Sequence, residues 1–212
     1  KGTTDLVVLP EMFSTGFSMR SAELAEPMDG PTVTWMKEQA WELDAAIYGS
    51  AIITEDGKCY NRGLFVKPDG TVIPYDTPGA QRVVVEWRGW RLLLQICYDL
   101  RFPVFARNRG DYDALLYVAN WPEPRRYPWS QLLIARAIEN QSYVIGVNRV
   151  GMDGKGHHYT GDSASIDPRG DAETMKASKE DVLHTVLHRE ALDDFRAKFP
   201  VADDADDFSL ML

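Results

Sequence analysis

The sequence is poor in cysteine and lacks both long apolar runs and excess positive charge. Two cysteines in 212 residues cannot form a disulfide framework, and they fit a reducing, cytoplasmic location. No apolar run approaches the roughly 20 residues that span a bilayer, and no signal-peptide pattern opens the chain, so we expect no membrane partner. The formal net charge of −9 makes binding to nucleic-acid phosphates unfavourable.

Motifs for common cofactors and metals are also missing. The chain has no phosphate loop and no dinucleotide fingerprint between a strand and a helix. His184 and His188 flank a strand-like run, where a spacing of four does not place both on one face. Ser163 lacks the glycine elbow of serine hydrolases. We therefore expect no metal site, and we expect the histidines to lie on the surface.

The remaining pattern predicts a single α/β domain over residues 1–212, with mixed sheets. The composition is 44% hydrophobic and 26% charged, which is ordinary for a soluble globular protein. Continuous apolar runs alternate with helical patterns, and turn signals such as Glu55-Asp56-Gly57 mark antiparallel hairpins. Predicted strands cover residues 6–9, 46–53, 59–66, 71–73, 83–87, 90–96, 114–120, 142–148 and 182–187, a strand and turn cover 161–170, and predicted helices cover 30–44, 103–109, 128–140 and 190–199.

Chemically costly groups follow three of the predicted strands. Glu11 comes directly after the strand that Pro10 ends, Cys97 ends another strand, and the loop 120–126 follows a third. A buried carboxylate is expensive unless it is paired or used, and the positive end of a following helix can depress the pKa of a cysteine. Glu11 could accept the thiol proton if burial raises its pKa. Structural packing of both groups remains the alternative. Cys59, with no acid or base nearby, is expected to be a small buried hydrophobe.

Several segments resemble the nitrilase, or carbon–nitrogen hydrolase, superfamily. Leu-Pro-Glu-Met-Phe at residues 9–13 and Ile-Cys-Tyr-Asp-Leu-Arg-Phe-Pro at 96–103 are similar to its two signature segments. Residues 119–122, 135–141 and 161–163 also match, in order, so the resemblance covers nearly the whole chain. Within the superfamily the chain is most similar to the omega-amidases, which hydrolyse the side-chain amide of 2-oxo acids such as 2-oxoglutaramate.

The resemblance implies an αββα sandwich that pairs into a homodimer, and a Glu-Lys-Cys triad. Carried over by position, Glu11 is the general base, Cys97 is the nucleophile, and the backbone N–H of Tyr98 is half of an oxyanion hole. The small-molecule amide would release ammonia through a cysteine thioester. This chemistry requires no metal and no organic cofactor.

The triad lysine is missing from the expected place. In the superfamily it follows a Tyr-Asp pair, ahead of a second, supporting glutamate, whereas here Tyr75-Asp76 is followed by Thr77-Pro78-Gly79. Either the protein has lost this segment and full activity with it, or the sequence omits a mobile loop between Asp76 and Thr77. We favour the omission, because active-site loops are commonly mobile and the chain opens abruptly at Lys1, ahead of which an amino-terminal strand and helix are expected. Lys58 and Lys67 occupy hairpin positions that do not match.

Residues near the matched strand ends are candidates for substrate binding. Arg125 or Arg126 could grip the acid group of the substrate with two hydrogen bonds, or form a solvated basic pair. Phe13 and Trp121 are candidate pocket walls that could equally be core. Two other functions remain open: an N-carbamoyl or nitrile hydrolase, and a catalytically inactive binding or scaffold protein that lacks the lysine.

Overall fold

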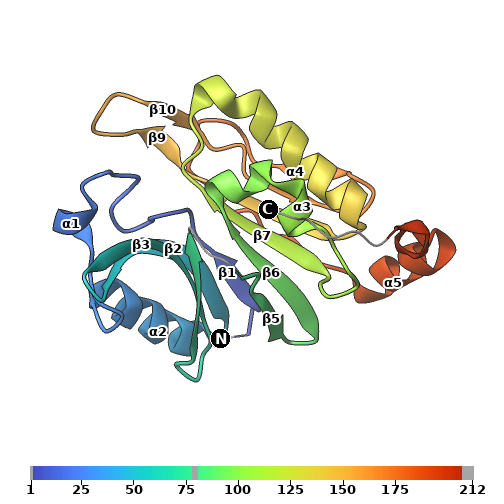
Figure 1. Ribbon diagram of the computed structural model, residues 1–212, viewed down its shortest axis with the longest axis horizontal. Helices are drawn as coiled ribbons and strands as arrows, with labels where there is room; N and C mark the ends of the chain where they lie inside the picture. The colour runs from blue at the N-terminus through green and yellow to red at the C-terminus, as the bar shows by residue number, and fades with distance from the viewer. Residues whose placement is uncertain (1, 78–80, 207–212) are drawn as a thin grey trace.

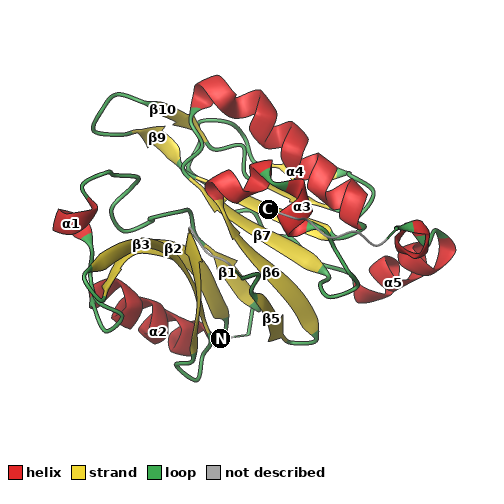
Figure 2. Ribbon diagram, viewed as in Figure 1, coloured by secondary structure: helices red, strands yellow, loops and turns green. Residues whose placement is uncertain are grey.

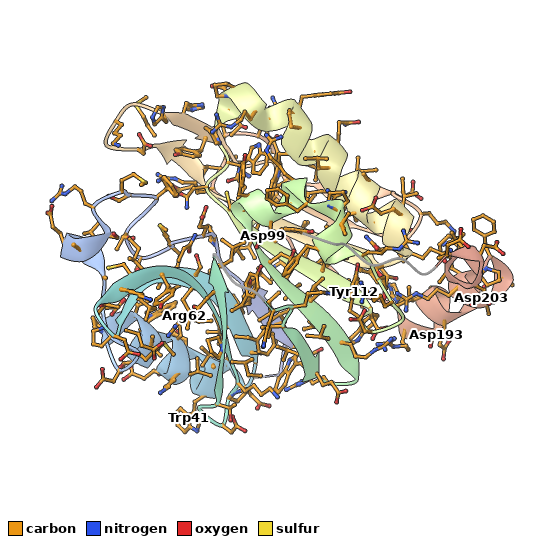
Figure 3. All side chains as sticks on the ribbon, viewed as in Figure 1. Trp41, Arg62, Asp99, Tyr112, Asp193 and Asp203 are labelled. Atoms are coloured by element: carbon orange, nitrogen blue, oxygen red, sulfur yellow. The ribbon has the colours of Figure 1, made fainter. Side chains whose placement is uncertain are left out.

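The computed structural model describes residues 2–77 and 81–206, and these form an αββα sandwich (Figures 1 and 2). Two larger β-sheets pack face to face, with a helix layer on the outer side of each sheet. The prediction of an α/β fold with mixed sheets is confirmed, since both sheets contain parallel and antiparallel neighbours. Figure 3 shows side chains filling the space between the sheets.

The first sheet has the order β1-β2-β3-β4. β1 and β2 are parallel, and the other neighbours are antiparallel hairpins, as the turn signals predicted. Two helices, α1 and α2, accompany this sheet. The bounds are β1 (Leu6–Val8), α1 (Ser21–Leu24), α2 (Pro31–Leu43), β2 (Ala46–Glu55), β3 (Lys58–Val66) and β4 (Val72–Thr77).

The second sheet has the order β12-β11-β8-β7-β6-β5. Its centre, β6-β7-β8, is parallel, so these three strands end at the same edge of the sheet. The bounds are β5 (Val84–Trp87), β6 (Trp90–Ile96), β7 (Ala114–Ala119), β8 (Tyr143–Asn148), β11 (Ala164–Ile166) and β12 (Ala172–Thr174). The helical elements are η1 (Cys97–Arg101), α3 (Pro103–Ala106), η2 (Glu123–Arg125), α4 (Arg126–Asn140), α5 (Arg189–Lys198) and η3 (Val201–Asp204).

The central strands of the second sheet are apolar on both faces, because successive side chains are buried on opposite sides of the sheet. In β6, Leu92 and Leu94 pack between the sheets against Tyr48 and Phe65, whereas Leu93 faces the helix layer of α4. Such strands read as continuous hydrophobic runs, because both sides are covered. Burying each leucine contributes about 1.5–3 kcal/mol.

Helix α2 follows its sequence signals closely. Pro31 occupies the first turn, and Asp44, with φ of 55°, ends the helix in the left-handed region. Val33 and Met36 are fully buried against the outer face of the first sheet. Leu43, in the last turn of the helix, is 38% exposed.

Two sequence expectations are wrong. Residues 182–187 do not form a strand, and Val182 and Val186 are about 70% exposed; the edge of β11 away from β8 pairs with β12 instead. Cys59 is exposed rather than buried, because it lies next to the β2–β3 turn, at the tip of the hairpin.

A further hairpin has no counterpart in the sequence prediction. β9 (Val150–Met152) and β10 (His158–Thr160) pair with each other in a separate two-stranded sheet. Their short length and the glycines between them hid the strand pattern. Among the described residues, no helix combines the length and apolar character needed to cross a bilayer.

Candidate active site

The carboxylate of Glu11 is buried and held at both oxygens. Glu11 follows β1 and is 3% exposed. Its Oε1 accepts a hydrogen bond from Asn61 Nδ2 at 2.7 Å, and its Oε2 accepts one from the backbone N–H of Asn120, also at 2.7 Å. The Asn120 side chain donates in turn to the backbone carbonyl of Glu11 at 2.6 Å. The acid is therefore fixed in both position and orientation.

Burial raises the pKa of Glu11 above its ordinary value of 4.5, because water is lost around the charge. The hydrogen bonds from Asn120, Cys97 and Asn61 act in the opposite direction, since they stabilise the ionised form. A carboxyl group with a raised pKa can take up and return a proton near neutral pH. The condition under which Glu11 could accept the thiol proton is therefore met.

Cys97 lies in a strained turn at the end of β6. Its φ of 45° is unusual for a residue other than glycine, and it opens the 3-10 turn η1. Asp99 Oδ2 stabilises the turn by accepting hydrogen bonds from the Ile96 backbone N–H at 2.8 Å and from the Tyr75 hydroxyl at 2.7 Å. Figure 3 labels Asp99 beside the end of β6.

The Cys97 thiol interacts with the Glu11 carboxyl group. Burial, then the Glu11 charge and the hydrogen bond to Glu11, raise the pKa of the thiol well above 9.0, while the Asn120 backbone N–H lowers it. The expected depression by a helix dipole is therefore wrong: the helical element after Cys97 is a single 3-10 turn of five residues, and a carboxylate lies against the sulfur. The thiol and the acid predicted from separate strand ends do come together.

Two residues of this cluster had no predicted role. Asn61 lies in β3 and Ser50 in β2, and the Ser50 hydroxyl donates to Asn61 Oδ1 at 2.8 Å. Asparagine is disfavoured within strands, so its place in the middle of a predicted strand was an available signal. Nothing local in the sequence pointed to Ser50.

The predicted pocket residues lie in different surroundings. Trp121 is buried, with Nε1 donating to the backbone carbonyl of Arg125 at 2.7 Å, and the Arg101 guanidinium stacks 4.9 Å from its ring centroid. The Tyr98 side chain is 62% exposed. Phe13 packs at 5.7 Å from the ring of Trp35, on the α2 side of the first sheet.

Among the described residues, no hydrogen bond or ion pair joins either predicted arginine to Glu11 or Cys97. Arg125 is exposed, and Arg126 forms an ion pair with Asp162 at 2.8 Å. The assignments of Arg125, Tyr98, Trp121 and Phe13 to substrate binding remain predictions.

No lysine within residues 2–77 and 81–206 forms a hydrogen bond or an ion pair with Glu11 or Cys97. Thr77 ends β4, and Pro78 and Gly79, which follow the expected lysine position, lie outside the described residues. The same described part of the chain holds no group of three or more histidine, cysteine, aspartate or glutamate side chains placed to bind a metal ion.

Comparisons with known proteins show which family the chain belongs to. The carbon–nitrogen hydrolase family model matches residues 1–196. The chain belongs to the carbon–nitrogen hydrolase family. The resemblance found in the signature segments is thereby confirmed.

Relatives match over most of the chain. Omega-amidase YafV of Escherichia coli (strain K12) is 48% identical over 221 residues, covering 97% of this chain and 86% of its own. The crystal structure of XC1258 from Xanthomonas campestris, a CN-hydrolase superfamily protein with an arsenic adduct in the active site, gives a TM-score of 0.95. It is 46% identical and covers 99% of this chain and 88% of its own. The 2-oxoglutaramate amidase of Bacillus subtilis is 29% identical, over 94% of this chain and 84% of its own.

The alignment with the E. coli protein is longer than the matched part of this chain. It has 221 positions, whereas 97% of 212 residues is about 206. About 15 aligned positions therefore have no residue in this chain. The relative therefore has residues within the matched region that this chain lacks.

Proposed function

We propose that the protein is a cysteine amidase that releases ammonia from a small carboxylated amide such as 2-oxoglutaramate. The observation that carries the proposal is the buried Glu11 carboxyl group, fixed at both oxygens and in contact with the Cys97 thiol. The names of relatives at 48% and 29% identity support the substrate class.

In the proposed reaction Cys97 is the nucleophile and Glu11 the general base. The Cys97 sulfur forms a bond to the amide carbonyl carbon as its proton passes to Glu11. The carbon–nitrogen bond then breaks, and the nitrogen leaves as ammonia with the proton from Glu11. Water, deprotonated by Glu11, attacks the thioester and frees the acid, and the proton returns to sulfur.

Charge that develops on the carbonyl oxygen requires donors. We assign the backbone N–H of Tyr98 as one of them, because it directly follows the nucleophile in the turn η1. The other polarising group in the superfamily is the triad lysine. We propose that it belongs to a segment inserted between Asp76 and Thr77, within a single domain that spans residues 1–212, and the surplus positions in the relative's alignment support this.

The proposal is tested by ammonia release from 2-oxoglutaramate, compared with N-carbamoyl amino acids and nitriles of similar size. Cys97→Ala should abolish release, whereas Cys59→Ser, a change at an exposed thiol, should leave it intact. Equal activity in Cys97→Ala would overturn the mechanism. A preference for the carbamoyl or nitrile substrates would overturn the substrate assignment alone.

Arg125 is the proposed ligand of the substrate acid group, and Trp121 and Phe13 are the proposed pocket walls. A charged hydrogen bond lost on binding should raise KM about tenfold or more. Arg125→Gln should therefore raise KM for 2-oxoglutaramate but not for a neutral amide of the same length. An equal change in KM for both amides would contradict this role.

An inactive binding or scaffold protein is the second candidate, and the missing lysine favours it. In that case neither the wild type nor Cys97→Ala would release ammonia from any amide tested, although both would be folded. The intact mass distinguishes an amidase that carries the inserted loop from an inactive protein that lacks it, since the loop would add to the mass of the 212 residues.

We also propose a cytoplasmic homodimer. Exposed apolar side chains next to the nucleophile turn support an interface there, with Phe102 50% and Val104 44% exposed. The free thiols of both cysteines suit a reducing compartment. Light scattering should report twice the monomer mass, and Val104→Asp should reduce it.

A further inference from the structure

Of the two carboxylate oxygens of Glu11, only one depends on a side chain alone. Oε2 is held at 2.7 Å by the backbone N–H of Asn120, which no substitution other than proline removes. Oε1 is held at 2.7 Å by the side-chain amide of Asn61. The orientation of the acid therefore depends on how the Asn61 amide is itself turned.

Ser50 determines that orientation. An asparagine amide has a donor end and an acceptor end, and the wrong rotation would place its oxygen against the carboxylate. The Ser50 hydroxyl donates to Asn61 Oδ1 at 2.8 Å, which leaves the NH2 end facing Glu11. Ser50 is fully buried and accepts the Met12 backbone N–H at 2.9 Å, so its own proton is directed at Asn61.

These contacts form a closed ring. It runs from the Met12 N–H through Ser50 and Asn61 to the carboxylate of Glu11, which is covalently joined to Met12. In the β2–β3 register Ser50 lies opposite Gly63 and Asn61 opposite Ile52, so the two polar side chains are diagonal neighbours on one sheet face. Rigid strands thus position the pair.

We infer that Asn61, oriented by Ser50, is a positioning residue that holds the Glu11 carboxylate where it takes the Cys97 proton. The inference rests on the proposed role of Glu11 as the base. In the described structure no hydrogen bond joins Asn61 to the Cys97 sulfur, and Asn61 acts through the acid. Its donor also stabilises the ionised form of Glu11 against the cost of burial.

The test compares Asn61→Ala and Ser50→Ala with Asn108→Ala. Asn108 is a matched control, because its side-chain amide donates to the Tyr112 carbonyl and to Ser142 Oγ before the starts of β7 and β8, far from the strand ends that carry Glu11 and Cys97. The readouts are the acidic limb of kcat/KM against pH, and the pH titration of the Glu11 carboxyl carbon by ¹³C NMR. That resonance is assigned by its absence in Glu11→Gln.

Loss of one hydrogen bond to the charged group should move both titrations upward by roughly one pH unit in Asn61→Ala. Ser50→Ala should move them in the same direction by less, and Asn108→Ala should lower stability without moving them. Unchanged titrations in folded Asn61→Ala would overturn the inference. If Asn61→Ala does not fold, the titration of Ser50→Ala decides in the same way.

The NMR readout separates this inference from the proposed function. A wild type that releases no ammonia but shows the shifted Glu11 titration in Asn61→Ala would overturn the amidase proposal and, with it, the catalytic purpose of the positioning. An active wild type whose Glu11 titration and pH profile are unaffected by Asn61→Ala would overturn the inference alone.

Discussion

The backbone N–H of Asn120 donates to the carboxylate of Glu11 at 2.7 Å, across 109 residues of sequence. Glu11 follows a strand of the first sheet and Asn120 follows a strand of the second. The same N–H also stabilises the thiolate form of Cys97. One backbone donor thus ties the acid, the thiol and both sheets together, and small changes at this junction should affect activity more than stability.

Glu11→Gln should reduce kcat/KM by at least about a thousandfold, because proton transfer by a positioned base contributes about 10²–10⁴ and leaving-group protonation is lost as well. Far-ultraviolet circular dichroism should be unchanged, since glutamine fills the same volume. Steady-state ammonia release measures the effect. Retention of more than a tenth of the activity would argue against Glu11 as the base.

In a plot of kcat/KM against pH, the acidic limb should lie above pH 4.5. Burial raises the pKa of Glu11 above that value, and the group must be ionised to accept the Cys97 proton, so activity rises as pH rises through the raised pKa. The thiol pKa lies well above 9.0, so its own ionisation should not produce a limb below that pH. A limb at or below pH 4.5 would contradict the assignment.

Tyr75→Phe should lower kcat/KM about tenfold, because it removes the 2.7 Å hydrogen bond that fixes Asp99 beneath the strained Cys97 turn. Tyr112→Phe is the control: it deletes the same hydroxyl from a fully buried tyrosine that donates to the Ala106 carbonyl (Figure 3). Both variants should lose about 1 kcal/mol in urea unfolding. Only Tyr75→Phe should lose activity.

Asp113→Asn should destabilise the protein by about 2–3 kcal/mol at pH 7, because the carboxylate is 2% exposed and pairs with three arginines. Two of them, Arg189 and Arg196, belong to α5, so the helix should exchange its amide hydrogens faster. Asp193→Asn, which removes a 60% exposed partner of Arg189, should change stability by less than about 1 kcal/mol.

The arginines lower the pKa of Asp113 below its ordinary 3.8. A depressed pKa stabilises the folded state above the unfolded-state value, and that contribution is lost as pH falls through it toward the folded-state value. The difference in unfolding free energy between the wild type and Asp113→Asn should therefore have its largest value at pH 7 and become smaller below about pH 4. A difference that is constant with pH would contradict the charge cluster.

The sequence alone predicted the layered α/β fold and singled out Glu11 and Cys97 as candidate site residues. Continuous apolar runs identified β6 and β7, because strands covered on both faces carry no polar alternation, and costly groups at their ends marked Cys97 and Asn120. The strand predicted over residues 182–187 is wrong, because an apolar pattern alone does not show whether a segment pairs with a sheet.

The surroundings of Glu11 and Cys97 follow from the packing of the two sheets and could not be predicted from the sequence. The pKa of Cys97 is raised by burial and by a carboxylate 86 residues away, and the orientation of Glu11 depends on Asn61 and Ser50 in two other strands. The local sequence pattern predicts secondary structure and burial, because these depend largely on each residue's neighbours along the chain. Hydrogen bonds between distant side chains are set by how the two sheets pack, and this packing places the acid against the thiol.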